Sequence, residues 1–225
     1  MGYFLDPTII LLLPAIIFGI WAQIKVKSSF KKYSKVPSMR GLTGAQAARL
    51  MLDKEGLHEV RIEGITGKLS DHYDPRGKVL RLSPDVANST SLAAVGVATH
   101  EAGHALQDAA DYSPMRIRSK LVPVANLGSQ MLFPLIIGAF IFKAGILLQV
   151  GIVLYAGAVL FHIVTLPVEF NASSRAIKAL ADNGILMEQE IGGAKKVLSA
   201  AAMTYVAATL VAVLTLIRLI VLSRD

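Results

Sequence analysis

The sequence contains no cysteine, so a disulfide framework, a CxxC redox pair and a thiolate zinc site are excluded. Charged residues are scarce, at 17% of 225 residues, where soluble domains have roughly 25%. Hydrophobic residues make up 53% of the chain, and so much apolar surface would not remain disordered in water. The composition therefore indicates an integral membrane protein with a modest polar part.

Four stretches have the roughly 20 mainly apolar residues that a membrane-spanning helix needs. They cover approximately residues 5–24, 121–142, 144–166 and 200–222. No basic residue precedes the first stretch and no small-residue cleavage site follows it, which favours a retained anchor over a secretory signal peptide. The second stretch contains the polar residues Asn126, Ser129 and Gln130. We expect them to face protein or a cavity rather than lipid.

The distribution of positive charge predicts the orientation of the chain. Of the 23 Lys and Arg residues, 16 lie in segment 25–120 and 4 in segment 167–199. By the positive-inside rule both segments are cytoplasmic and both termini lie outside a cytoplasmic (inner) membrane. Because membrane orientation accounts for where the net charge of +7 lies, nucleic acid is not expected as a partner.

The polar segments show helix and strand patterns. Thr43 and Gln46 have the spacing of a capping box, and Gly56 suits the end of the same helix. Segment 59–83 has the alternation of short β-strands, with a turn at 74–77. A further helix is expected over 91–110, after several possible N-cap residues.

This last helix carries an HExxH motif, formed by His100, Glu101 and His104. Residues four apart share one helical face, so both imidazoles can bind one Zn²⁺. The glutamate then lies where it can take a proton from a water molecule that the metal activates. The motif predicts a zinc-dependent hydrolase in which Glu101 is the general base. The competing interpretation, two core histidines beside an unrelated glutamate, is disfavoured because the motif is rare by chance.

The third zinc ligand is expected to come from farther along the chain. The metzincin extension is absent, because Gln107 and Ala110 stand where it requires glycine and histidine. Glu169 is the best candidate, since the two spans between His104 and Glu169 return the chain to the same membrane face. An interfacial glutamate that binds no metal is the alternative.

Four segments together resemble the YugP-type neutral zinc metallopeptidases, which are bacterial multi-pass membrane proteins. They are the motif at 100–104 and segments 69–75, 167–170 and 201–207. The chain is more distantly similar to the HtpX-type and CAAX-processing proteases, which share a gluzincin core. In those relatives the ligand segment reads E-x-x-A-D, and its aspartate orients a zinc-bound histidine. Here Ser173 stands at the aspartate position, so Asn171, Ser173 or another residue would take that role.

The group that would stabilise the oxyanion is less clearly marked. Tyr205 is expected at about the height of the site and would act as a second catalytic residue by donating its hydroxyl. A tyrosine of the interfacial belt is an equally good explanation of this position. His72 and Arg175 are further candidates, with a surface histidine and a structural ion pair as the alternatives. The family core also implies that an extended peptide lies along a strand edge within 59–83.

The sequence thus predicts a mainly α, four-span membrane protein, a single domain over 1–225 with a small zincin-like cytoplasmic lobe containing a few short strands. The predicted function is a zinc endopeptidase acting on membrane or membrane-proximal proteins at the cytoplasmic face. A site-2-type protease is disfavoured because polar residues flank the motif helix. The alternative is a catalytically silent membrane adaptor with a structural metal site. Neither the natural substrate nor the oligomeric state follows from the sequence.

Overall fold

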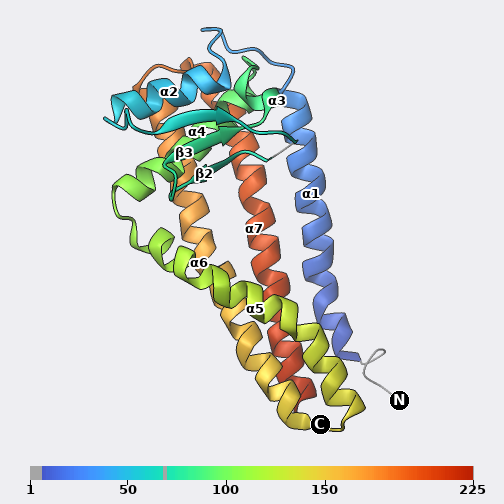
Figure 1. Cartoon of the computed structure of the whole chain (residues 1–225). Helices are drawn as coiled ribbons and strands as arrows, with labels where there is room; N and C mark the ends of the chain where they lie inside the picture. The colour runs from blue at the N-terminus through green and yellow to red at the C-terminus, as the bar shows by residue number, and fades with distance from the viewer. Residues whose placement is uncertain (1–6, 68–69, 225) are drawn as a thin grey trace. The chain divides into compact units, whose positions relative to one another are not determined.

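The computed structural model describes residues 7–67 and 70–224 and is mainly helical (Figure 1). Residues 5 and 6, which begin the first predicted span, lie outside the described residues. In chain order the elements are η1 (Pro7–Leu12), α1 (Leu13–Tyr33), α2 (Gly44–Lys54), β1 (Arg61–Gly64), β2 (His72–Asp74), β3 (Val79–Leu82), α3 (Pro84–Ala87), α4 (Leu92–Ala109), α5 (Ser113–Ile141), α6 (Gly145–Asp182) and α7 (Glu188–Leu222).

Four of the described helical stretches are long and apolar enough to cross a membrane. They are Thr8–Tyr33, Ser113–Ile141, Gly145–Asp182 and Glu188–Leu222. Each contains or overlaps one predicted span, so the prediction of a mainly α, four-span protein with a few short strands is confirmed. Helices α6 and α7 also continue through most of the predicted polar segment 167–199. Pro167 lies inside α6 and removes one backbone hydrogen bond without ending the helix.

The chain divides into two compact units, which we describe separately. The apolar unit comprises the described residues of Met1–Ala22, Pro114–Pro167 and Thr204–Asp225. The lobe comprises Gln23–Ser113 and Val168–Met203. The lobe therefore contains the HExxH helix α4 and the end of α6 that carries Glu169.

The apolar unit exposes large hydrophobic side chains and packs its helices closely. Ile17, Ile146 and Val153 are 66%, 63% and 72% exposed, as expected for side chains in contact with lipid. Helix α5 meets α6 at Gly128, where a Cβ would clash with the backbone oxygen of Leu154. Glycine is required at this position because any side chain would force the two helices apart.

The polar residues of α5 are exposed. Asn126, Ser129 and Gln130 lie on the surface of the chain, and none of the three side chains forms a hydrogen bond within the described residues. We expected them to face protein or a cavity, and no described part of this chain covers them.

The lobe contains a three-stranded sheet with the order β1-β3-β2. The central strand β3 pairs in parallel with β1 and in antiparallel fashion with β2, so that Leu80 lies opposite both Ile62 and Tyr73. The predicted turn joins β2 to β3, where Asp74 Oδ1 accepts a hydrogen bond of 3.0 Å from the backbone N–H of Arg76. Both β2 and β3 contact α4 (Figure 1).

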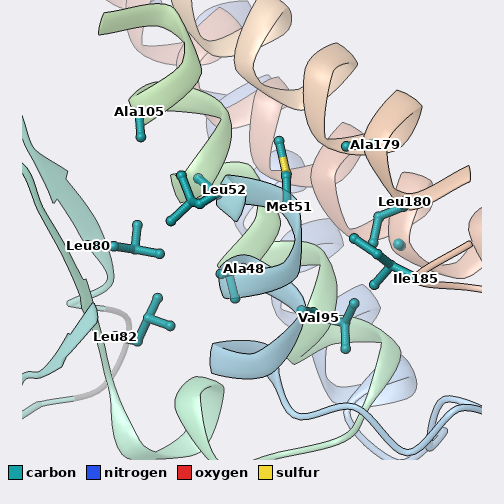
Figure 2. Close-up of a cluster of buried hydrophobic side chains, with 14 of the residues drawn as sticks. Ala48, Met51, Leu52, Leu80, Leu82, Val95, Ala105, Ala179, Leu180 and Ile185 are labelled. Atoms are coloured by element: carbon teal, nitrogen blue, oxygen red, sulfur yellow. The ribbon is translucent and has the colours of Figure 1, made fainter. Parts of the chain in front are cut away.

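The hydrophobic core of the lobe joins the sheet to helices α2, α4 and α6. Figure 2 shows Leu80 and Leu82 of β3 on one side of α2, with Leu180 and Ile185 on the other side. Met51 of α2 is fully buried between these groups. Helix α2 itself begins as the sequence predicted, because Thr43 and Gln46 form a complete capping box. This core holds α4 and the adjoining turns of α6 in a fixed arrangement.

Candidate metal centre

Helix α4 presents both histidines of the motif on one face. Its first turn is capped by Ser91, whose side chain accepts a hydrogen bond from the backbone N–H of Ala94. His100 and His104 lie one turn apart, and their ring centroids are 4.9 Å from each other at an angle of 82°. Two adjacent imidazoles at this spacing can direct their Nε2 atoms toward one metal ion.

Glu169 of α6 completes a cluster of three possible metal ligands with His100 and His104. Its Oε2 lies 3.3 Å from the Nε2 of His100 and 3.7 Å from the Nε2 of His104. Its side chain is almost fully buried. The ligand atoms of all three residues lie within 4.8 Å of one another. The residues predicted from the motif and from membrane topology thus meet in space.

These separations fit a tetrahedral zinc site. Zinc lies about 2.0–2.2 Å from nitrogen and carboxylate ligands, so neighbouring tetrahedral ligand atoms are about 3.3 Å apart. The two Nε2–Oε2 distances, 3.3 and 3.7 Å, are close to this value. Two histidines and one glutamate also form the donor set of catalytic zinc sites that leave one position for water.

A second layer of hydrogen bonds holds the two imidazoles. His100 Nδ1 lies 3.1 Å from the hydroxyl oxygen of Ser173, and His104 Nδ1 lies 2.9 Å from Oε1 of Gln107. The amide of Gln107 donates to the backbone oxygen of Val168 at 2.8 Å and to Oδ1 of Asn171 at 3.0 Å. Each Nδ1 therefore lies against a neutral oxygen that can accept its hydrogen, and in that tautomer the Nε2 lone pair is left for a metal.

The comparisons with known proteins agree with this geometry. Residues 8–224 match the model of a family described as "Putative neutral zinc metallopeptidase". The chain belongs to this family. A relative from Bacillus subtilis (strain 168), named "Putative membrane protease YugP", is 46% identical over 214 residues, which is 95% of this chain and 95% of the relative. No solved structure matches the chain. The triad of His100, His104 and Glu169 in this family member is therefore suited to zinc.

Glu101, the predicted general base, lies beside the ligand triad on α4 without being one of its members. Burial raises the pKa of Glu101, and the nearby His100 and His104 offset only part of this effect. A raised pKa favours a carboxylate that can accept and later return a proton. Burial lowers the pKa of His104, but its hydrogen bond to Glu169 and the charge of Glu101 raise it more, so the net shift is upward.

Gly103, inside the motif, allows α4 and α6 to approach closely. A Cβ at Gly103 would lie 2.6 Å from the backbone oxygen of Ala172, well inside van der Waals contact. Ala172 is itself fully buried. The close approach of these two helices brings Glu169, three residues before Ala172, to the histidines of α4.

The remaining predicted residues are not members of the cluster of possible metal ligands. Tyr205 is in the apolar unit, so its predicted catalytic role stays a prediction. His72 lies on β2 with its Nδ1 2.8 Å from the backbone oxygen of Ser70, and it does not join the ligand cluster. Arg175 donates from Nε to Oδ1 of Asn171 at 2.8 Å. Asn171 therefore lies between Arg175 and Gln107, and in the described hydrogen bonds it contacts neither His100 nor His104.

Gln107 is the residue that sequence reasoning missed. In the sequence it stands where the metzincin pattern requires glycine, and no role at the metal was predicted for it. Its position three residues after His104 places it on the same helical face, which was the available signal. Its side chain is fully buried and uses its carbonyl and its amide group in hydrogen bonds to α4 and α6. The partners of its amide lie on α6, so they could be identified only from the position of that helix in the tertiary structure.

Replacing Gln107 with Leu is expected to weaken zinc binding about 10- to 100-fold, as is typical when a hydrogen bond to a metal-bound histidine is removed. The change removes the side-chain oxygen that accepts a hydrogen bond from the N–H of His104. It also removes the amide that donates a hydrogen bond to the carbonyl of Val168. Zinc affinity is measured by competition with a chromophoric chelator. The control is Thr99→Val, which removes another fully buried polar side chain from α4, one that bonds only to its own helix. Equal affinities in the two variants would contradict a role for Gln107 at the metal.

Proposed function

We propose that the protein is a zinc-dependent endopeptidase that hydrolyses peptide bonds of membrane or membrane-proximal proteins at the cytoplasmic face. One observation carries the proposal: His100, His104 and Glu169 converge as possible ligands, while the adjacent Glu101 is left outside the triad. A purely structural zinc site would use four protein ligands and would need no base. Membership of a zinc metallopeptidase family supports the same class of reaction.

Each residue of the site has a separate task in the proposed reaction. His100, His104 and Glu169 would hold the metal, with Ser173 and Gln107 fixing the orientation of the two imidazoles. Zinc, when bound, lowers the pKa of water and polarises a carbonyl group. Glu101 would accept a proton from the attacking water and return it to the leaving amine. Tyr205 is proposed as a further donor to the oxyanion.

The sheet offers an edge for an extended substrate. Strand β2 lies at one end of the order β1-β3-β2 and contacts α4, which carries the motif. Its outer edge has no strand partner among the described residues. An extended peptide adding to this edge would run alongside the helix that carries Glu101. The excess of basic residues in 25–120 supports the cytoplasmic placement of this edge.

Removal and return of zinc test the proposal. Detergent-purified protein is incubated with a quenched fluorescent peptide library of mixed sequence, before and after dialysis against a chelator. We expect cleavage to stop in the metal-free protein and to return with about one equivalent of zinc per chain. Mass spectrometry of the products should show internal cleavage, as an endopeptidase requires. A zinc-loaded, folded protein that cleaves nothing would favour the silent adaptor instead.

A further inference from the structure

Helix α5 carries a row of side chains with alternating spacings of four and three residues. This α5 seam consists of Val122, Asn126, Ser129, Phe133 and Ile136. The first four are exposed and the last is half-buried. Spacings of four and three place side chains on one helical face and are typical of helices that pack in left-handed pairs. Gln130, one turn after Asn126, is exposed beside the seam.

The polar members of this face lie deep in the predicted span. Gln130 is near the middle of the stretch 121–142, and Asn126 is one turn closer to its beginning. No water is available in the hydrocarbon core to satisfy an amide, so such groups nearly always contact protein. Within the described residues neither amide has a hydrogen-bond partner. Within the apolar unit, the described residues thus leave this polar face open to a partner.

The contact of α5 with α6 occurs on a different face. Gly128 lies against the backbone of Leu154. At 100° per residue, the seam points more than a quarter-turn away from Gly128. A second helix can therefore pack on the seam without displacing α6.

A second copy of this chain can provide hydrogen-bond partners for the polar side chains of the seam, for two reasons. All copies have one orientation in the membrane, so a two-fold axis along the membrane normal places each residue opposite its own equivalent at the same depth. An amide or a hydroxyl both donates and accepts hydrogen bonds, so Asn126 and Ser129 on the seam can each bond to the same residue of a copy, and Gln130 beside the seam can bond to a polar group of the copy. Charged side chains on this face would repel their equivalents, and none is present among them.

We propose that α5 forms the interface of a symmetric homodimer, in which the two α5 seams pack together, the amide of Asn126 bonds to its equivalent and the amide of Gln130 bonds to a polar group of the other copy at the edge of the seam. The dimer does not depend on the peptidase activity proposed above. It gives the polar face of α5 the protein contact that the described residues of the apolar unit do not provide.

Cysteine cross-linking in native membranes tests the interface directly, because the chain contains no cysteine of its own. Single variants Ser129→Cys and Phe133→Cys place one thiol on the seam. Leu127→Cys and Met131→Cys place one thiol at similar depths on other exposed positions of α5, since Leu127 and Met131 are 51% and 37% exposed. A disulfide needs Cβ atoms about 3.5–4.5 Å apart, so only facing positions cross-link readily on mild oxidation.

We expect covalent dimers with the cysteine at either seam position and little cross-linking with the cysteine at either control position. Equal cross-linking at all four positions would indicate random collision and would overturn the proposal. No cross-linking at any of them would also overturn it, as would adducts with a different membrane protein in place of a second chain.

The amides are tested in the purified protein by fluorescence energy transfer between two labelled populations on dilution in lipid vesicles. The double variant Asn126→Leu/Gln130→Leu is expected to dimerise about tenfold more weakly, since each membrane hydrogen bond adds a factor of roughly three. The control Leu127→Ala/Met131→Ala should leave the equilibrium within about twofold of wild type. Equal dimerisation of wild type and the amide variant would show that these amides do not form the interface.

Discussion

Replacing Glu101 with Gln is expected to lower the rate of peptide hydrolysis by about 10²- to 10⁴-fold, the usual contribution of a general base. The amide keeps the size of the side chain but cannot accept the proton of the attacking water. Glu101 is not among the three clustered ligands, so the variant should bind zinc as the wild type does. The measurements are cleavage of the mixed peptide library and elemental analysis of zinc in the same preparation.

The matched control for this variant is Glu188→Gln. Glu188 is an exposed glutamate in the first turn of α7. Its replacement by Gln removes one negative charge, as Glu101→Gln does, but at a residue outside the triad. Glu188→Gln should retain the wild-type rate. If Glu101→Gln kept both its zinc and the wild-type rate, the proposed proton transfer by Glu101 would be wrong, whatever the identity of the enzyme's substrate.

Replacing Glu169 with Gln is expected to reduce bound zinc from about one per chain to a small fraction of that value, because a catalytic site needs its three protein ligands. The neutral amide oxygen is a much poorer zinc ligand than a carboxylate, although it fits the same space. Elemental analysis of detergent-purified protein gives the stoichiometry. Zinc should also raise the unfolding temperature of the wild type but not of the variant, because only a bound ligand stabilises the folded state.

Glu190 provides a control of the same chemistry. It is a second buried glutamate of the lobe, and its oxygens accept hydrogen bonds from the backbone N–H groups of Met39 at 2.7 Å and Met187 at 2.8 Å. Glu190→Gln weakens these contacts and should lower stability by about 1–3 kcal/mol. It should leave the zinc content unchanged. Unchanged zinc in Glu169→Gln would show that Glu169 is not the third ligand.

Local patterns predicted much of the fold because their causes are local. The capping box of Thr43 and Gln46 is present, and helix α2 ends beside Gly56, which has a positive φ of 76°. A glycine tolerates this left-handed backbone without steric cost, which is why it marked the end of the helix in the sequence. The helix predicted over 91–110 is observed as Leu92–Ala109. Hydrophobic length alone predicted the four candidate spans.

Several features of the fold were not predictable because they depend on distant residues. The parallel pairing of β1 with β3 joins strands that are separated by β2 in the sequence. No helix bounds were predicted within 167–199, where α6 continues past Pro167 to Asp182 although a proline normally favours a helix boundary. In the lobe, buried residues such as Ala176 and Leu180 pack this polar segment of α6 against the core. Tertiary packing thus overrode the local preference.

The sequence by itself determined the helical class, the spans and the pairing of His100 with His104, because hydrophobic length and the turn of a helix follow from neighbouring residues alone. It also made Glu169 the leading candidate for the third position. Only the tertiary structure decided which groups hold the imidazoles: Ser173 for His100 and Gln107 for His104. The Ser173–His100 contact and the hydrogen bond from Gln107 to Val168 join α4 to α6 across more than 60 residues, and they depend on the close approach that Gly103 permits at Ala172. Hydrogen bonds of this kind are set by the distance between two packed helices, which no local sequence pattern encodes.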